Sequence, residues 1–249
     1  MKCELIDFLG DDLRVVNAAR VSFDKESDWE YLNKDGEVIF PKPNWTEDWD
    51  IGVDALLQEK DVKLLKYLAN HDHWSPFSHV MVTMRETVPI FVARQRFKHM
   101  IGFTYNEVSR RYVDDPPKFF RPETWRGAPE NRKQGSSDVE IVDLRMQGFQ
   151  MQTVNAAYEK LIQHAETLYR DMIEAGVAPE QARMVLPQSM YTSYYVTGSL
   201  PAWSRAYKLR SDEHAQREIQ DLAVEWNKVI SNIAELKHSW SALIGEEKA

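Results

Sequence analysis

The spacing of apolar residues divides the chain into short strands separated by longer helices. Runs rich in β-branched and apolar residues predict strands over residues 2–9, 79–88 and 190–198. Apolar positions at helical spacing predict helices over residues 15–23, in a segment ending near 70, and over 90–100, 139 to about 175, 201–210 and 213–236, with a further helix opened by Pro179. The helices over 201–210 and 213–236 are the last elements expected along the chain.

Two polar segments interrupt this pattern. Residues 24–50 carry Trp29, Trp45 and Trp49 but little periodicity, and we expect an excursion or hairpin there. Residues 114–137 are rich in proline, glycine and serine, which predicts a loop. Strands and long helices follow one another without regular β–α–β alternation. We therefore expect an α+β fold, with a mixed or antiparallel sheet packed against long helices, in one domain spanning residues 1–249.

Charge and cysteine content narrow the class of protein. The 249 residues carry a formal net charge of −8, which argues against general affinity for nucleic acid or acidic membranes. Cys3 is the only cysteine, so we expect no intrachain disulfide, no thiolate metal site and a reducing, cytoplasmic compartment. No apolar run approaches the roughly 20 residues that span a bilayer, and the N-terminus lacks the pattern of a signal peptide.

One segment opposes the overall negative charge. Residues 85–111 contain six basic and two acidic residues, a local charge of +4, which is costly unless an anion lies nearby. Gln95, Lys98 and His99 share a helical face, and Asn106, Glu107 and Ser109 follow a bend at Gly102. Cations for phosphate and amides for base edges suit a nucleotide. A solvated basic helix face followed by a charged turn is the alternative. The chain has neither the glycine-rich dinucleotide fingerprint nor a P-loop.

Lys98-His99-Met100, followed after eight residues by Ser109, resembles the Arg-His-Arg…Ser signature of flavin-dependent thymidylate synthases. Further blocks similar to that family occur in its order, at residues 18–23, 73–79, 91–95, 106–112, 181–187 and 209–216. The resemblance covers most of the chain. It departs from the family at Lys98 and Met100, which replace arginines, and at Ser199 and Arg205, where asparagines are usual.

The resemblance implies methylation of dUMP to dTMP, with FAD as cofactor, NADPH as reductant and 5,10-methylenetetrahydrofolate as carbon donor. It also implies a homotetramer whose active sites are shared between subunits. The implied dUMP residues are Gln95, Arg96, Phe97, Lys98, Glu107, Val108, Ser109, Arg110, Arg111, Arg183 and Arg210. The implied FAD residues are His73, Ser75, Lys98, His99, Met100, Glu107, Ser199, Leu200, Pro201 and Arg205.

Within this set, Arg210 is the expected catalytic residue, because the matching arginine of the family faces the uracil ring and favours its ionisation. Ser109 is expected to bind the nucleotide, since no base that would activate it is evident in the sequence. Cysteine-dependent thymidylate synthases attack uracil with a thiolate in a basic pocket. Cys3 lies on an expected strand near the N-terminus without such neighbours, so reduced flavin is expected to take over this role.

Several alternatives stay open at this point. The changed flavin residues favour a flavin-dependent relative with another product, such as a pyrimidine nucleotide hydroxymethylase. A non-catalytic nucleotide-binding relative is the second alternative. His71, His73 and His79 suggest a metal cluster, but no further ligand is evident and none is expected. Trp203 and Tyr207, four residues apart, are expected to belong to the core.

Overall fold

The computed structural model describes residues 1–32, 37–39, 54–112, 115–130, 135–144 and 152–245. A four-stranded sheet forms the centre, with strand order β1-β5-β9-β6 and every neighbouring pair antiparallel. Its strands are β1 (Lys2–Leu9), β5 (Met81–Pro89), β9 (Tyr191–Ser199) and β6 (Phe103–Glu107). The predicted α+β class is confirmed, and the sheet is the antiparallel one of the two forms expected.

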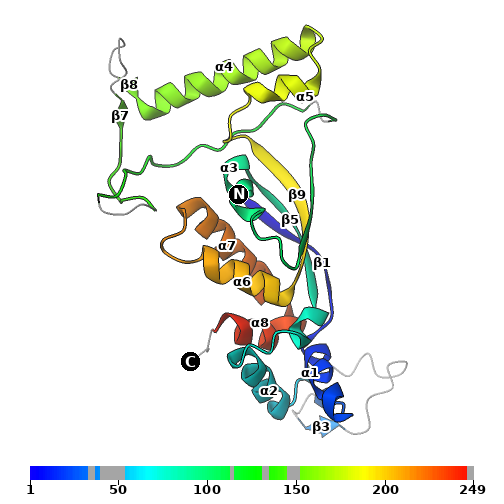
Figure 1. Cartoon of the computed structure of the whole chain (residues 1–249). Helices are drawn as coiled ribbons and strands as arrows, with labels where there is room; N and C mark the ends of the chain where they lie inside the picture. The colour runs from blue at the N-terminus through cyan, green and yellow to red at the C-terminus, as the bar shows by residue number, and fades with distance from the viewer. Residues whose placement is uncertain (33–36, 40–53, 113–114, 131–134, 145–151, 246–249) are drawn as a thin grey trace.

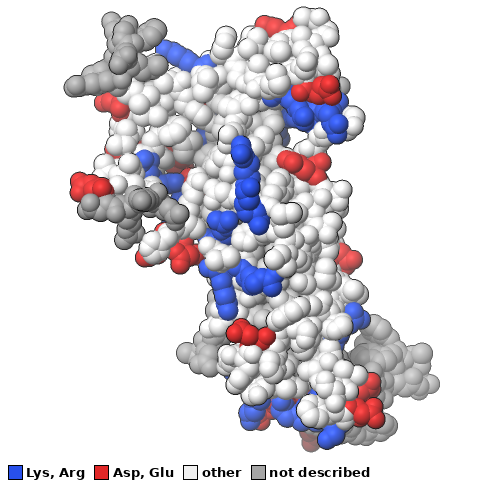
Figure 2. Space-filling model, viewed as in Figure 1, with Lys and Arg blue, Asp and Glu red and all other residues white. Residues whose placement is uncertain are grey.

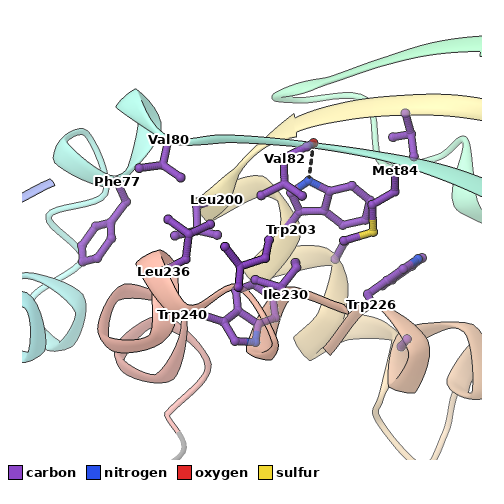
Figure 3. Packing of buried hydrophobic residues seen from close by; sticks show 14 of the residues in the cluster. Phe77, Val80, Val82, Met84, Leu200, Trp203, Trp226, Ile230, Leu236 and Trp240 are labelled. Atoms are coloured by element: carbon purple, nitrogen blue, oxygen red, sulfur yellow. Dashed lines mark hydrogen bonds between the residues drawn. The ribbon is translucent and has the colours of Figure 1, made fainter. Parts of the chain in front are cut away.

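Alternation along the two central strands decides which face of the sheet becomes the core. Met84 pairs with Val196 in the register, and both side chains are fully buried. On this face lie α6 (Leu200–Arg210) and α7 (Arg217–Ser231). Trp203 of α6 lies against the strand and donates its indole N–H to the carbonyl of Val82 at 3.1 Å (Figure 3). The prediction that Trp203 belongs to the core is confirmed.

Helices also close one end of the sheet (Figure 1). These are α1 (Asp12–Arg20), α2 (Glu59–Asn70) and α8 (Lys237–Ile244), with the 3-10 helix η2 (Pro76–His79) between them and β5. Asp12 is buried and accepts the backbone N–H groups of His238 and Ser239, at 2.9 and 2.8 Å, so it ties α1 to the start of α8. Buried backbone donors need such partners, which explains a carboxylate in this position.

The opposite end carries a long helix and an extended segment. Helix α4 (Val154–Glu174) is followed by α5 (Pro179–Ala182) and the 3-10 helix η3 (Arg183–Val185). We call residues 115–144, as far as they are described, the arm; Figure 1 shows this segment running alongside α4 and past α7 with little regular structure. Its end, β7 (Asp143–Leu144), pairs with β8 (Gln152–Thr153). The predicted loop over residues 114–137 agrees with this description for the residues that the structure describes; residues 114 and 131–134 lie outside them.

Some predicted boundaries are wrong. The helix expected from Val139 begins at Val154. Val139 and Ile141 instead form extended pairs with Gly127 and Trp125 within the arm, and Thr153 caps the helix through Ala156 N at 3.1 Å. Residues 145–151 of that prediction lie outside the described residues. The strand expected from His79 begins at Met81, since His79 belongs to η2.

Two further differences concern the ends of helices. The helix expected to reach residue 100 is α3 (Ile90–Arg96), and the strand β6 that follows was not predicted. The helix expected over 213–236 is divided into α7 and the 3-10 helix η4 (Ala234–Leu236), and α8 comes after it.

The polar segment forms a small second sheet, β3-β2-β4, from β2 (Glu30–Leu32), β3 (Val38–Ile39) and β4 (Asp54–Leu56). This supports the expected hairpin, although residues 33–36 and 40–53 lie outside the described part. Among the described residues, no helix has both the length and the apolar character needed to cross a membrane.

Candidate functional site

The side chain of Arg210, at the end of α6, is held by two hydrogen bonds that it donates to segment 95–99. Its Nε donates to Nε2 of His99 at 2.8 Å, and one terminal nitrogen donates to the carbonyl of Gln95 at 3.3 Å. The guanidinium is half-buried, so water only partly screens its charge. The predicted catalytic arginine is therefore held in a fixed orientation beside the predicted binding segment.

His99 is kept neutral by its surroundings. Burial, which is the largest cause, and the positive charges of Arg210, Arg96 and Arg205 together lower the pKa of His99 to about 4. An arginine Nε carries a proton and can only donate, so Nε2 of His99 accepts and its remaining proton sits on Nδ1. At neutral pH His99 therefore adds no positive charge to that of the neighbouring arginines.

Arg210 borders a hollow of 560 Å³. The hollow is lined by Gln95, Gly135, Lys208, Leu209, Arg210, Asp212, His214, Ala215 and Gln216. Gln95 donates from Nε2 to Oε1 of Gln216 at 2.6 Å, which fixes the orientation of its amide. Figure 2 shows basic side chains gathered in a band across the visible face, over the region of α3, α6 and α7. This surface favours an anionic ligand despite the negative charge of the whole chain.

A second group of predicted nucleotide residues borders another hollow, of 440 Å³. Glu107, Val108, Arg110 and Arg183 line it, together with Thr87 and Ser193 among others. Thr192 donates its hydroxyl to Oε1 of Glu107 at 2.6 Å, and Arg110 donates to the carbonyl of Asp115. No lining residue is common to this hollow and the one beside Arg210.

The 440 Å³ hollow lies at the end of the sheet where β5 and β6 end and β9 begins. Strand residues whose side chains alternate with the buried Met84 and Tyr194 face away from α6 and α7. Thr87 and Ser193 are in that outward phase, whereas Thr192 and Glu107, the register partner of Tyr194, are in the inward phase, and all four line the hollow. Within one subunit, Arg183 and Glu107 thus border a different hollow from Arg210 and Gln95.

Ser109 and Arg111 lie beyond β6 and are bonded to each other. The Nε of Arg111 donates to the hydroxyl oxygen of Ser109 at 3.2 Å, and its guanidinium lies 5.0 Å from the ring centre of Tyr112. A serine acting as nucleophile would also donate its proton to a base, and within the described residues no side chain accepts a hydrogen bond from Ser109. This geometry is typical of a binding hydroxyl. Lys98, at the other end of the segment, is exposed.

Part of the predicted flavin set forms a cluster at the start of α6. Arg205 donates from a terminal nitrogen to the carbonyl of Ile101 at 3.0 Å, and Ser199 N donates to the carbonyl of Gly102 at 3.1 Å. Gly102 has φ +81°, and a Cβ there would come within 2.9 Å of Ala202 Cβ, so glycine permits this close approach. Met100 is 73% exposed beside the cluster, whereas Leu200 and Pro201 are buried under it.

The other predicted flavin residues, His73 and Ser75, lie on the turn between α2 and η2, and both are exposed. The ring centres of His71 and His73 are 6.3 Å apart, and the ring centre of Tyr67 on α2 lies 4.1 Å from that of His71. Within the described residues, no three His, Cys, Asp or Glu side chains converge as a metal site. In the described part of the chain, no hydrogen bond or ring contact joins His73 or Ser75 to the Ser199 cluster.

Arg96 was expected to contact the nucleotide, but its side chain is fully buried. Its Nε donates to Oε1 of Glu86 at 3.1 Å, and its guanidinium carbon lies 4.3 to 5.2 Å from four aromatic ring centres. These rings belong to Phe103, Tyr105, Trp203 and Trp226. Arg96 is thus placed behind the site, where it cannot reach a ligand in this conformation.

The buried cation still acts on the site through a neighbour. Arg96 donates to the hydroxyl of Tyr105 at 2.5 Å, and that hydroxyl donates to the carbonyl of His99 at 2.6 Å. Phe97, also in the predicted set, packs edge-to-face on Tyr105 and Tyr194 at 5.0 and 4.8 Å. The hydrogen bond from Tyr105 and the packing of Phe97 therefore fix the backbone of residues 97–99.

Cys3 lies in an environment that suppresses its reactivity. Burial raises the pKa of its thiol, and the nearby Glu86 raises it further. Its sulfur is 3.2 Å from the sulfur of Met84, inside the sheet. A thiol with a raised pKa is a poor nucleophile, which agrees with the expectation that Cys3 takes no part in chemistry.

Three polar residues at the site were not predicted. Gln216 donates from Nε2 to Glu218 at 2.8 Å, and Arg126 donates to the other carboxylate oxygen of Glu218 at 2.6 Å. Gln216 and Arg210 both lie in the block over residues 209–216 that resembles the family. This shared block was the one signal in the sequence that could have identified Gln216. Arg126 and Glu218 are 92 residues apart, and neither has a motif around it.

Comparisons with known proteins point in one direction. A family profile described as "Thymidylate synthase complementing protein" matches residues 4–234. The flavin-dependent thymidylate synthase of Thermosipho africanus is 34% identical over 95% of this chain and 87% of its own length. That of Thermosipho melanesiensis is 36% identical over 90% of this chain and 83% of its own length.

The fold gives the same answer. The crystal structure of a UMP/dUMP methylase, PolB, from Streptomyces cacaoi bound with 5-Br dUMP superposes with a TM-score of 0.70 at 27% identity. It covers 98% of this chain and 95% of the other. Since the family profile and these relatives each extend over nine-tenths of the sequence, this chain belongs to the flavin-dependent thymidylate synthase family.

Proposed function

We propose that this chain is a flavin-dependent thymidylate synthase, which methylates dUMP to dTMP with 5,10-methylenetetrahydrofolate as carbon donor and NADPH as reductant. The observation that carries the proposal is the fixed Arg210 guanidinium, bonded to His99 and Gln95 within a family block. The names of the relatives and the nucleotide bound to the structural neighbour support the same substrate class. The single, unreactive thiol fits a cytoplasmic enzyme that does without cysteine catalysis.

In this proposal Arg210 polarises the uracil ring. A preorganised guanidinium stabilises negative charge that develops on the pyrimidine as C5 becomes nucleophilic. His99 and the Gln95 carbonyl orient it, so little reorganisation is needed when the charge appears. The exposed cations of Arg111, Arg183 and Lys98 are the proposed partners of the nucleotide phosphate.

The cluster of Ser199, Arg205 and Met100 is the proposed place of the flavin. An exposed guanidinium beside irregular backbone suits the pyrophosphate of FAD, and the thioether of Met100 suits contact with a flat ring. Bound reduced flavin supplies the hydride that completes the methyl group. The protein orients the ligands and excludes water around the pyrimidine.

We further propose that a complete site forms only between subunits of a homotetramer. Arg183 and Glu107 border one hollow and Arg210 and Gln95 another, and the two hollows share no lining residue. One nucleotide could contact both sets if two copies brought the hollows together, as closed symmetric assemblies do.

Complementation tests the shared site. Arg210→Ala and Arg183→Ala chains should each be inactive alone, and coexpression should recover activity because some sites receive both intact residues. The control is Arg210→Ala coexpressed with the double variant, which cannot form an intact site. Mixed oligomers of the two single variants that stay inactive would contradict the proposal.

The function itself is tested by spectrum and product. Purified protein incubated with FAD should show flavin absorbance, and incubation with dUMP, methylenetetrahydrofolate and NADPH should give a product with the mass of dTMP. A product heavier by one oxygen would identify the hydroxymethylase alternative. Protein that takes up no FAD and changes no nucleotide would instead be a binding relative.

A further inference from the structure

A hollow of 510 Å³ lies between the arm, α3, α4 and the start of α7. Four aromatic residues line it, namely Phe91, Phe120, Trp125 and Tyr158. They form two edge-to-face pairs, Phe91 with Phe120 at 5.6 Å and Trp125 with Tyr158 at 5.2 Å. Such a volume and lining are typical of small-molecule sites, which commonly measure about 300–1,000 Å³.

The rings are fixed by hydrogen bonds at their polar ends. Tyr158 donates its hydroxyl to the carbonyl of Phe120 at 2.6 Å, and Trp125 donates its indole N–H to Asn155 at 2.6 Å. Fixed rings stack on a flat ligand at a small entropic cost. The aromatic wall is therefore preorganised for a planar ring.

The same hollow has a polar edge. Arg126 and Glu218 line it as a donor and an acceptor joined at 2.6 Å. Ser189 also lines it, and its hydroxyl oxygen is buried and has no hydrogen-bond partner within the described residues. A buried polar group without a partner costs about 1–3 kcal/mol, so a ligand or water that bonds to it is favoured. Donors and acceptors at one edge match the amide edge of a heterocycle.

Gln216 connects this hollow to the site of Arg210. It lines both hollows, and its amide accepts from Gln95 and donates to Glu218, which in turn accepts from Arg126. A ring bound against the aromatic wall would therefore touch the hydrogen-bond chain that orients Gln95. This connection points to a reactant of the same reaction rather than to an unrelated ligand.

We propose that the 510 Å³ hollow binds the flat heteroaromatic ring of a co-substrate, with its amide edge towards Arg126, Glu218 and Ser189. This inference rests on the proposed function, which requires two compounds of this chemistry. One is the reduced folate, through its pterin ring, and the other is the nicotinamide dinucleotide. Both have flat rings with neighbouring donors and acceptors, and the experiment distinguishes them.

The test measures equilibrium binding by calorimetry to flavin-loaded full-length protein. The probes are 5-formyltetrahydrofolate, NADP⁺ and dUMP, each titrated separately. Ser189→Trp fills the hollow, and Trp125→Leu removes one ring without adding bulk, which keeps the test valid if the larger change prevents folding. Gln188→Trp is the matched control, because this neighbouring side chain is exposed and does not line the hollow.

One of the two co-substrate probes should bind at least tenfold more weakly to both hollow variants, while Gln188→Trp binds it within about twofold of the parent. Binding of dUMP should stay unchanged in all three. The inference is overturned if neither co-substrate probe binds the parent, or if both bind the hollow variants as well as the parent, while dUMP and FAD still bind. Loss of dUMP and FAD binding by the parent itself would count against the proposed function instead.

Discussion

Arg210 and His99 form a 2.8 Å hydrogen bond in which the arginine Nε donates and the imidazole Nε2 accepts. The bond joins the end of α6 to the turn after α3, two segments 111 residues apart in the sequence. It requires a neutral histidine with its proton on Nδ1. The orientation of the proposed catalytic cation thus depends on a histidine that must stay uncharged.

The first prediction concerns the titration of His99. Burial and the cations of Arg210, Arg96 and Arg205 lower its pKa to about 4. The unfolded chain keeps an ordinary histidine pKa near 6.5 and binds a proton first as pH falls. The contribution of His99 to the free energy of unfolding should therefore fall as pH drops from about 6.5 to about 4.

Denaturation in urea between pH 4 and 8 measures this effect, and His99→Gln, which cannot be protonated, should weaken the pH dependence. A matched His164→Gln variant, at an exposed position on α4, should leave it unchanged, since no contact joins His164 to Arg210 in the described structure. An NMR titration that finds His99 protonated near pH 6.5 would contradict the neutral pair.

The second prediction concerns Arg210 itself. Arg210→Ala should lower kcat by about 10²–10³, because it removes a preorganised charge that stabilises the developing anion. Flavin absorbance should persist, since the Ser199 and Arg205 cluster is unchanged. Lys228→Ala, an exposed cation on α7, is the control and should keep normal turnover. Near-normal kcat in the Arg210 variant would remove its assignment as the catalytic residue.

The third prediction concerns the buried pair of Arg96 and Glu86. Both side chains are fully buried, so Arg96→Met leaves a carboxylate without its cation and should cost about 3–5 kcal/mol of unfolding free energy. Adding Glu86→Gln should recover part of this loss. Arg94→Met changes an exposed arginine of the same helix and should cost about 0.5 kcal/mol or less. Equal losses of unfolding free energy for the Arg94 and Arg96 variants in chemical denaturation would contradict the expected cost of leaving Glu86 without its cation.

The fourth prediction concerns Cys3. Cys3→Ala should leave kcat within about twofold of the parent, because a thiol with a raised pKa supplies no thiolate. A modest loss of stability, about 1 kcal/mol, is expected from the lost contact with Met84. Steady-state kinetics and thermal unfolding on the same preparation separate the two effects. A large fall in kcat with an unchanged unfolding temperature would mean that the thiol takes part in the reaction.

The sequence by itself determined the central strands and the family. Alternating apolar positions in β5 and β9 mark their buried face, because neighbouring side chains of a strand point to opposite sides. The basic segment over residues 85–111 indicated the nucleotide chemistry, because its residues are close in sequence and share a local geometry. The blocks that resemble the family, in the family's order, indicated the family. The same local signals placed the start of α4 at Val139, which is wrong. Val139 and Ile141 pair in extended form with Gly127 and Trp125 instead.

The tertiary structure decided which of these residues can meet a ligand. Arg96 reads as one more cation of a basic segment, yet β6 and α6 enclose it beside Glu86, and β6 itself is recognisable only once Phe103 and Tyr105 pair with β9. The separation of Arg183 from Arg210, and the aromatic hollow under the arm, likewise depend on contacts between segments distant in sequence. Periodicity along the chain indicates which face of a helix or strand a side chain belongs to. It does not indicate which distant segments pack against that face.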